Sequence, residues 1–350
     1  MPDLRDHTTL RLGGPGRSWV RATTEAELVT AVADADSAGT PVLVLAGGSN
    51  LVVADDGFDG LVVQVATTGV HAEPDDVGAG PQCGGVEVRV AAGEDWDALV
   101  ARAVTRGWSG IEALSGIPGA VGSTPIQNVG AYGQDVSQAI SRVRTWDRVE
   151  RTQRTFAAGD CGFGYRHSRF KADAGRYLVL EVTFQLRVGA LAAPVEYAEL
   201  ARHLGVEVGE RAPLADVREA VLALRAGKGM VLDPGDHDTW SAGSFFTNPF
   251  LTPEQAAALP EAAPRWEQAD GTVKSSAAWL IEHAGFGKGY VSEAAGERVA
   301  LSTKHTLALT NRGGATTEEL LALAREVRDG VEARFGVRLV NEPVTVGCSL

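Results

Sequence analysis

The chain has 350 residues, of which 44% are hydrophobic, and a formal net charge of -13 at pH 7. A chain of this length can bury a sizeable core and divides into two or three domains. The acidic charge argues against nucleic acid or an anionic membrane surface as a partner. No apolar run reaches the length of a membrane-spanning helix. Three widely spaced cysteines without a CxxC motif are typical of reduced thiols in a cytoplasmic protein; they are Cys83, Cys161 and Cys348.

The N-terminal part of the chain begins with a strand and a capped helix. Residues 17–21 predict a short strand, and Thr24 with Glu27 forms a capping box that opens a helix ending at Gly39. The continuous apolar run 41–46 is typical of a buried strand.

A glycine-rich turn follows this strand directly. It reads Gly47-Gly48-Ser49-Asn50, and residues 51–65 then predict a strand, an Asp-Gly turn and a second strand. The turn therefore joins strand to strand, whereas the dinucleotide site of a Rossmann fold joins strand to helix. The turn is interpreted either as part of a different kind of cofactor site or as a plain β-turn.

Hydrophobic patterning predicts the remaining elements. Strands are predicted at 86–93, 141–147, 178–186, 306–311 and 337–340. Helices are predicted at 95–106, 214–226 and 275–283, after Pro253, and from Thr316, where Glu319 completes a second capping box. The Pro-, Gly- and Asp-rich loop 231–243 marks a predicted domain boundary, behind which lies a compact α+β unit.

The segment 110–133 has the most unusual composition of the chain. It reads GIEALSGIPGAVGSTPIQNVGAYG and carries no charged side chain after Glu112. Glycine lets backbone N–H groups approach a ligand closely, and such a nest of donors suits the pyrophosphate of a cofactor. The sequence contains neither a P-loop nor a Rossmann fingerprint at this point. A set of tight turns in a glycine-rich protein is the alternative.

Two further segments are notable. Residues 161–171 combine aromatic and basic side chains between glycine hinges. Asp236-His237-Asp238 looks like a metal-binding triplet, but it lies in a Pro/Gly turn, so a solvated loop is the favoured interpretation. Lysine is scarce, with five in the whole chain, so a loop lysine is a candidate for anion binding.

Read in order, seven motifs resemble those of the UDP-N-acetylenolpyruvoylglucosamine reductases, the MurB family. The motifs are AGGSNLVV, AAGEDWDALV, SGIPGAVGSTPIQNVGAYG, FGYRHSRFK, AGSFFTNP, QADGTVKSSAAWLIE and NEPVTVG. The similarity spans nearly the whole chain, and its length together with Tyr197 resembles the longer subclass with a tyrosine-bearing loop. Each motif alone is weak, whereas all seven in order make chance a poor explanation.

The resemblance implies an α+β fold, namely the two-subdomain FAD-binding fold of the vanillyl-alcohol oxidase (PCMH) type with a C-terminal α+β substrate-binding domain. It implies FAD-binding subdomain 1 at 1–65, joined by the C-terminal segment 337–350, subdomain 2 at 66–229 and the substrate-binding domain at 230–336. The implied reaction is NADPH-dependent reduction of UDP-N-acetyl-3-O-(1-carboxyvinyl)-glucosamine to UDP-N-acetylmuramate through bound FAD, in peptidoglycan precursor synthesis. A cytoplasmic monomer without a metal, nucleic acid or membrane partner is expected.

The resemblance also implies catalytic roles for three residues. Ser244 would be the general acid that protonates an enolate-like carbon. Arg166 would bind the substrate carboxylate with two hydrogen bonds. Glu342 would assist only if it is protonated or acts through a hydrogen bond. The alternatives are a turn cap for Ser244 and a surface carboxylate for Glu342.

The resemblance assigns further residues to the cofactor and the substrate. The cofactor residues are Gly47, Gly48, Ser49, Asn50, Ile117, Pro118, Gly119, Gly122, Ser123, Thr124, Gln127, Asn128, Gly130 and Tyr165. The substrate residues are Tyr197, Lys228, Asn248, Trp266, Lys274 and His305. Asn248 and Lys274 resemble groups that contact the UDP part. The alternatives for these positions are an exposed lysine, a core tyrosine and an Asn-Pro turn.

Two positions and one segment depart from the family pattern. Trp266 stands where tyrosine is common, and His305 stands where an amide side chain is common. The segment 228–244 is a few residues longer than in familiar members. These departures concern the packing of the nucleotide and leave the proton donor and the flavin untouched.

Two other functions remain open. The first is a flavin-dependent oxidase on the same cofactor fold, which would act on a sugar or an alcohol with O2. Such an oxidase has no need for the SFFTNP segment or the terminal Glu-Pro element. The second is a flavin-binding scaffold without catalysis, which has no physical reason to carry Ser244, Arg166 and Glu342 together.

Overall fold

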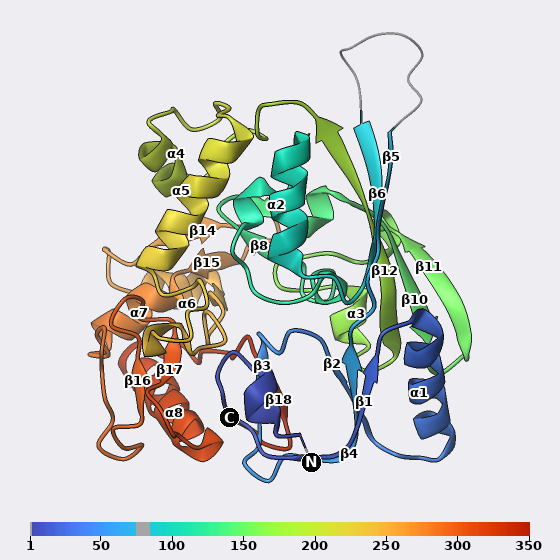
Figure 1. Cartoon of the computed structure of the whole chain (residues 1–350). Helices are drawn as coiled ribbons and strands as arrows, with labels where there is room; N and C mark the ends of the chain where they lie inside the picture. The colour runs from blue at the N-terminus through green and yellow to red at the C-terminus, as the bar shows by residue number, and fades with distance from the viewer. Residues whose placement is uncertain (1, 75–84) are drawn as a thin grey trace. The chain divides into compact units, whose positions relative to one another are not determined.

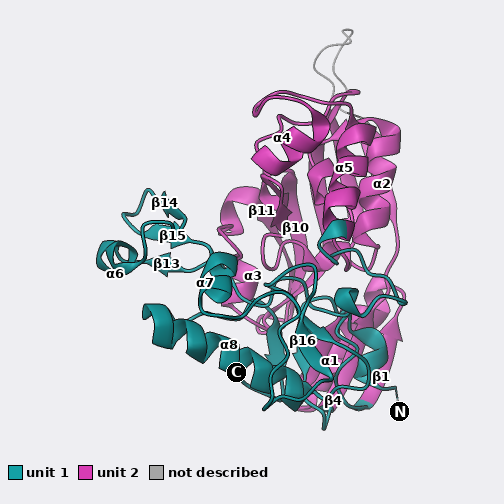
Figure 2. Ribbon diagram, turned by 90° about the vertical axis from the view of Figure 1, so that its left-hand side faces the viewer, with its two compact units in different colours: residues 1–17, 48–58, 227–350 teal, residues 18–47, 59–226 magenta. Residues whose placement is uncertain are grey.

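The computed structural model describes residues 2–74 and 85–350 (Figure 1). The chain forms two compact units, each built from segments that are far apart in the sequence (Figure 2). Unit 1 comprises residues 1–17, 48–58 and 227–350, and unit 2 comprises residues 18–47 and 59–226. The three-part division expected from the sequence, with boundaries at 65, 229 and 336, stays a prediction.

Unit 2 contains most of the sheet structure. Its strands are β1 (Gly16–Ala22), β2 (Val42–Leu45), β4 (Phe58–Val65), β5 (Val70–Pro74), β6 (Gly85–Ala91), β7 (Trp108–Ser109), β8 (Gly130–Ala131), β9 (Gln134–Asp135), β10 (Ile140–Asp147), β11 (Thr152–Ala157) and β12 (Tyr177–Val188). Its helices are α1 (Glu25–Ser37), α2 (Trp96–Arg106), α3 (Arg169–Ala172), α4 (Ala198–Leu204) and α5 (Leu214–Gly227).

The strands of unit 2 form two main sheets. The smaller one has the order β1-β4-β2, and its β2 and β4 are parallel. The larger one has the order β11-β10-β12-β6-β5, with β7 also paired to β12, and its pairings are antiparallel. Helix α2 covers this larger sheet, because its buried Trp96 ring lies 5.9 Å from the Phe184 ring of β12.

Local signals explain where the helices begin and end. Thr24 and Glu27 form the expected capping box of α1, and Asp95 caps α2 by accepting the N–H of Ala98 at 2.8 Å. Helix α2 ends at Gly107, whose φ of 71° is the left-handed conformation that glycine adopts without strain. The predictions for these helices are confirmed.

Unit 1 contains short strands around a helical core. Its strands are β3 (Leu51–Val53), β13 (Phe250–Leu251), β14 (Arg265–Glu267), β15 (Val273–Ser275), β16 (Val299–Leu301), β17 (Leu309–Asn311) and β18 (Val344–Val346). Its helices are α6 (Pro253–Ala258), α7 (Ala277–His283) and α8 (Thr317–Phe335). The sheets are β13-β15-β14, β16-β17 and the parallel pair β18-β3.

Two strand predictions in unit 1 need correction. The predicted strand at 337–340 is wrong: that segment is irregular, and the C-terminal strand is β18, which begins at Val344. The prediction followed from the alternating hydrophobic pattern, because Val337 and Leu339 are both buried, but this segment is not assigned to a strand. The predicted strand at 306–311 is shorter, because residues 302–308 form a turn closed by a 2.8 Å bond from the Ser302 N–H to the Ala308 carbonyl.

The described cysteines are free thiols, and Cys83 lies outside the described residues. Burial raises the pKa of the Cys161 thiol to about 11, and burial also raises the pKa of Cys348. Both side chains are therefore protonated near neutral pH and are poor nucleophiles. None of the helices in the described part of the chain is long and apolar enough to cross a membrane.

Candidate functional site

Two glycine-rich loops of unit 2 lie against each other. A Cβ atom added to Gly47 would come within 2.6 Å of the Gly119 Cα atom, so Gly47 has no room for a side chain. Among the described residues, none accepts a hydrogen bond from the backbone N–H of Gly47, Ile117 or Gly119. Unpaired N–H donors on two adjoining loops form a nest of the kind that binds phosphate oxygens. These loops therefore fit the pyrophosphate of FAD.

The hydroxyl groups of the same segment turn toward the backbone. Ser123 and Thr124 donate to the carbonyl groups three residues before them, at 2.6 and 2.8 Å. Gly122 is packed so closely that an added Cβ atom would come within 2.5 Å of the Ala92 Cβ atom. These residues shape the loop, and their contact with a cofactor stays a prediction. Pro118 and Gln127 lie in the same segment.

Asn128 connects the glycine-rich segment to the aromatic and basic segment. Its φ is 47°, and its Nδ2 atom donates to the Gly164 carbonyl at 3.1 Å. The Arg166 guanidinium donates to the Gly130 carbonyl at 3.2 Å. The structure therefore brings Asn128, Gly130 and the Tyr165-Arg166 dipeptide together within unit 2.

Tyr165 and Arg166 form the tip of a tight hairpin. Backbone hydrogen bonds of 3.0 and 3.2 Å between Gly164 and His167 close it. Arg166 has a φ of 52°, which residues other than glycine rarely adopt. Lys171 donates to the Arg166 carbonyl at 3.0 Å, and the guanidinium carbon lies 5.4 Å from the Tyr165 ring centroid. A strained arginine held in this way is typical of a functional site.

Tyr197 is the N-cap residue of α4 and its side chain is exposed rather than part of the core. Its ring meets the Tyr132 ring edge-on, with the ring centroids 5.5 Å apart. Tyr132 has a φ of 50° and directly precedes Gly133 at the end of the glycine-rich segment. The alternative of a core tyrosine is therefore excluded, and Tyr197 lies beside the predicted cofactor loop.

Glu112 is a structurally important residue that the sequence analysis did not single out. Its side chain is fully buried. One carboxylate oxygen accepts the Gly110 N–H at 2.6 Å, and the other accepts the Ala193 N–H at 2.7 Å and the Gln134 side-chain amide at 3.0 Å. This cage ties the start of the glycine-rich segment to the chain that leads to Tyr197. The available signal was a single carboxylate in a stretch without other charges.

Ser244 and Glu342 lie on neighbouring backbone segments of unit 1. The Glu342 N–H donates to the Phe245 carbonyl at 2.8 Å, and Phe246 and Asn341 form an isolated antiparallel bridge. Ser244 is half-buried, and its hydroxyl makes no hydrogen bond within the described part of the chain. Ser244 is therefore not a turn cap.

The turn of residues 48–50 lies at the same place in unit 1. The Asn50 Nδ2 atom donates to the Glu342 carbonyl at 3.5 Å, and the Asn50 carbonyl accepts the first N–H of β18 at 2.9 Å. Gly48 has a φ of 61°, and an added Cβ atom would lie 1.9 Å from the His7 carbonyl oxygen, so only glycine fits there. This turn therefore adjoins the catalytic candidate Glu342.

Lys274 and Trp266 are directly opposed in the sheet β13-β15-β14. Phe250 opposes Lys274 from the other neighbouring strand, so the three side chains share one face of the sheet. The Phe250 and Trp266 side chains are 46% and 50% exposed, and the Lys274 Nζ atom lies 6.0 Å from the Phe250 ring centroid. Phe250 was missed in the sequence, although an aromatic residue one position after Asn248-Pro249 was a signal. The Asn248 Oδ1 atom accepts the Ala277 N–H at 3.0 Å, at the start of α7.

Asp236 and Asp238 pair with cations of the protein. The described residues include no group of His, Cys, Asp and Glu side chains that could hold a metal ion. The Asp236 carboxylate lies 2.5 Å from the Lys304 ammonium, which lowers the pKa of Asp236. Asp238 is buried and accepts the Arg312 guanidinium at 2.7 Å. The expectation of a solvated loop is therefore wrong for Asp238, which is buried, whereas Asp236 is partly exposed.

His305 lies in the turn of residues 302–308. The Phe245 N–H donates to the Leu307 carbonyl of this turn at 2.7 Å. The structure therefore brings His305 into the same part of unit 1 as Ser244.

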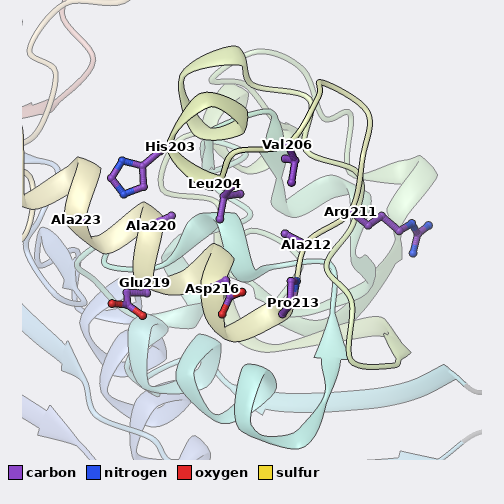
Figure 3. A pocket seen from close by; sticks show the side chains of 10 residues that line it. All are labelled: His203, Leu204, Val206, Arg211, Ala212, Pro213, Asp216, Glu219, Ala220 and Ala223. Atoms are coloured by element: carbon purple, nitrogen blue, oxygen red, sulfur yellow. The ribbon is translucent and has the colours of Figure 1, made fainter.

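A groove of about 350 Å³ lies between α4 and α5 (Figure 3). Its lining mixes apolar side chains with both signs of charge and contains none of the predicted site residues: it comprises His203, Leu204, Val206, Arg211, Ala212, Pro213, Asp216, Glu219, Ala220 and Ala223. The candidate Lys228 directly follows the last residue of α5 and is half-buried.

Models of two protein families match this chain. Residues 17–154 match the FAD binding domain, and residues 233–346 match the UDP-N-acetylenolpyruvoylglucosamine reductase, C-terminal domain. The crystal structure of the UDP-N-acetylenolpyruvylglucosamine reductase (MurB) from Thermus caldophilus is similar at a TM-score of 0.65 and 24% identity, over 99% of this chain and 97% of the other. The expected α+β fold, with an FAD-binding domain and the C-terminal domain of this family, is confirmed.

Similar sequences cover nearly the whole chain. The UDP-N-acetylenolpyruvoylglucosamine reductase of Cutibacterium acnes is 60% identical over 344 residues, which are 98% of this chain and 89% of that protein. The protein of the same name from Streptomyces avermitilis is 55% identical over 354 residues, which are 98% of this chain and 93% of that protein. The chain therefore belongs to the UDP-N-acetylenolpyruvoylglucosamine reductase family.

Proposed function

We propose that this chain reduces UDP-N-acetyl-3-O-(1-carboxyvinyl)-glucosamine to UDP-N-acetylmuramate with NADPH, through bound FAD, in peptidoglycan precursor synthesis. The names of the relatives and the FAD binding domain support the substrate and the cofactor. The observation that carries the proposal is the position of Ser244: its hydroxyl has no partner among the described residues, and the next residue, Phe245, accepts the backbone N–H of Glu342 at 2.8 Å. The cytoplasmic location and monomeric state expected from the sequence are part of the proposal.

The proton is the first task of the protein. When bound, FAD supplies the transfer of hydride from NADPH to the terminal carbon of the enolpyruvyl double bond. The substrate then carries negative charge that extends into its carboxylate, and a proton must reach the adjacent carbon. Ser244 donates this proton, because an enolate-like carbon is basic enough to take it from a well-placed hydroxyl.

The developing negative charge is the second task. The Arg166 guanidinium is a planar cation that can bind the carboxylate with two parallel hydrogen bonds. The guanidinium donates to the Gly130 carbonyl and lies near the Tyr165 ring, and Lys171 holds the backbone of the hairpin through the Arg166 carbonyl. Such preorganised charge is the usual way in which a protein stabilises an enolate-like state. Glu342 assists as a hydrogen-bonding group beside Ser244.

The nucleotide is the third task. Lys274, between Phe250 and Trp266, offers one cation for a diphosphate and two exposed aromatic rings for a base. His305 and Asn248 add polar groups, and Lys228 and Tyr197 meet the remainder of the substrate. These assignments follow the resemblance and are supported by the shared sheet face and the shared turn described above.

An anaerobic flavin experiment tests the proposal. The purified protein is loaded with FAD, reduced with NADPH, and mixed with the enolpyruvyl substrate while the visible absorbance of the flavin is followed. Return of the oxidised absorbance without oxygen is expected. A reduced flavin that stays bleached until air is admitted would instead indicate an oxidase. A bound flavin that NADPH does not reduce would indicate a binding scaffold without catalysis. A protein that takes up no FAD would overturn the assignment of the cofactor.

A further inference from the structure

The loop of residues 233–241, called the anchor loop below, is bonded to the turn of residues 302–308. Asp238 of the anchor loop is 5% exposed. One of its oxygens accepts the Thr303 N–H at 3.0 Å and the Arg312 guanidinium at 2.7 Å, and the other accepts the Thr303 hydroxyl. A buried carboxylate with three donors, one of them charged, is a strong and directional anchor.

Asp236 makes a second connection to the same turn. Its carboxylate pairs with the Lys304 ammonium at 2.5 Å, and its other oxygen accepts the Asp238 N–H at 3.0 Å. Thr303 and Lys304 are thus both held by the anchor loop, and the next residue in the chain is His305. The Lys304 ammonium pairs with Asp236. The residue of this turn that is assigned to the nucleotide is His305.

The anchor loop is itself fixed to other parts of unit 1. The Trp240 carbonyl accepts the Asn311 N–H at 3.0 Å, and the Ser241 carbonyl accepts the Thr9 hydroxyl at 2.7 Å. A Cβ atom added to Gly229 would lie 3.0 Å from the Asp238 carbonyl oxygen, so the loop also packs on the residue after Lys228. A loop attached at this many points can transmit its position to the turn that it holds.

We propose that Asp238, supported by Asp236, is a positioning residue that holds the turn of residues 302–308 and thereby places His305 for the nucleotide part of the substrate. This inference rests on the proposed function, which assigns His305 to a nucleoside diphosphate. Asp238 touches no substrate and acts through the turn.

Asp238→Asn tests the inference in the FAD-loaded enzyme. The amide keeps the size of the side chain but removes the charge and replaces one acceptor with a donor. We expect the Kd of UDP and the KM of the substrate to rise about 10-fold, because small displacements of binding groups have large effects. The rate of flavin reduction by NADPH, the flavin content and kcat are expected to stay within about twofold.

Asp233→Asn is the matched control. Asp233 belongs to the same loop and is exposed, and its carboxylate accepts the Gly235 N–H at 2.8 Å. UDP binding by this variant is expected to stay within about twofold of the wild type. An equal loss of UDP affinity in both variants would mean that any disturbance of the loop has this effect, and would overturn the specific role of Asp238.

A double-mutant cycle with His305→Ala separates positioning from general destabilisation. If Asp238 acts through His305, Asp238→Asn weakens UDP binding by no more than about twofold in the His305→Ala background. If Asp238→Asn weakens UDP binding by the same factor with and without the His305 side chain, the inference is overturned. If Asp238→Asn does not fold, Asp236→Asn, which loses only the half-exposed pair with Lys304, takes its place in the cycle with an expected effect of about threefold.

The inference and the proposed function fail in different ways. A wild-type holoenzyme that does not bind UDP overturns the assignment of the nucleotide, and the inference with it. If the wild-type enzyme binds UDP and the folded Asp238→Asn variant binds it equally well, the inference alone is overturned.

Discussion

The backbone N–H of Glu342 donates a 2.8 Å hydrogen bond to the carbonyl of Phe245, and this bond places the glutamate next to Ser244. The bond joins main-chain atoms, so it does not depend on either side chain. The two candidate catalytic side chains can therefore be replaced one at a time without separating the segments that carry them.

Ser244→Ala is expected to lower turnover by at least about 10²-fold, because a positioned proton transfer contributes on this scale. The variant should still take up FAD and be reduced by NADPH at the wild-type rate. Its stability should be unchanged, since the hydroxyl makes no hydrogen bond with the described residues. Stopped-flow absorbance for each half-reaction and thermal unfolding check these points. Near-normal turnover would remove Ser244 from the mechanism, and Ser37→Ala on the surface of α1 is the control.

Arg166→Gly is expected to separate activity from stability. Glycine relieves the φ of 52° but loses the bond to the Gly130 carbonyl, and each of these effects is about 1 kcal/mol. The free energy of unfolding should therefore change by less than about 1 kcal/mol. Turnover should fall by at least about 10²-fold, because the charge that stabilises the enolate-like state is gone. Arg166→Lys keeps the positive charge but cannot make two parallel hydrogen bonds, so its turnover should lie between those of the wild type and Arg166→Gly. Full activity in Arg166→Gly would contradict the assignment.

Trp266→Ala is expected to weaken UDP binding by about 10-fold, since stacking of an aromatic side chain on a base contributes about 1–3 kcal/mol. Phe250→Ala should act in the same direction, because both rings flank Lys274 on one sheet face. Trp266→Tyr should restore most of the affinity. Titration calorimetry with UDP measures all three, with the exposed Val291→Ala as the control. Unchanged affinity in both alanine variants would exclude this face as the nucleotide site.

Glu112→Gln is expected to reduce the free energy of unfolding by about 1–3 kcal/mol. An amide can accept the N–H of Ala193 and the amide of Gln134, but its NH₂ group then faces the Gly110 N–H, so one buried donor loses its acceptor. Urea denaturation measures the loss. The exposed Glu150→Gln should stay within about 0.5 kcal/mol. Equal stability of the two variants would mean that the Glu112 cage adjusts without cost.

Asp147 is expected to make stability depend on pH at the acidic end. The Arg176 guanidinium, together with the backbone N–H groups of Val149 and Glu150, lowers the pKa of Asp147 to about 2. Because the pKa is lower in the folded state than its ordinary value near 4, this contribution is present above about pH 4. It is lost as the pH falls toward about 2.

The Asp147→Asn variant should therefore be less stable than the wild type near pH 7, by up to about 2 kcal/mol. The difference between the two proteins should shrink as the pH is lowered from about 5 to about 2.5. Urea denaturation at a series of pH values measures it. A difference that stays constant over this range would show that the ion pair with Arg176 does not set the stability.

Local features of the fold could be predicted from the sequence, because their causes lie within a few residues. Thr24 with Glu27 and Thr316 with Glu319 both form the expected capping boxes, and Gly107 ends α2 where the pattern placed it. The alternation of β6 likewise predicted which of its faces is buried.

Features that depend on distant partners could not be predicted. Asp238 was expected in a solvated loop, and its burial could not be foreseen because its partners, Thr303 and Arg312, are more than sixty residues away. The prediction of a strand at 337–340 was wrong for the same reason. The alternation of buried and exposed residues is present there, but the segment is not part of a strand in the described structure. The resemblance named Ser244 and Glu342, but only the fold shows the backbone bond that places them side by side.

The parallel pairing of β18 with β3 has a consequence for the order in which the molecule forms. The ribosome makes β3 long before β18, so β3 waits for its partner while the residues between the two strands are added. All the residues of unit 2 have been made by Ala226, so its core can close while unit 1 is still incomplete. Glu342 can join Ser244 only after β18 has been made, so a nascent chain in which unit 2 is complete still lacks this pair of candidate catalytic residues.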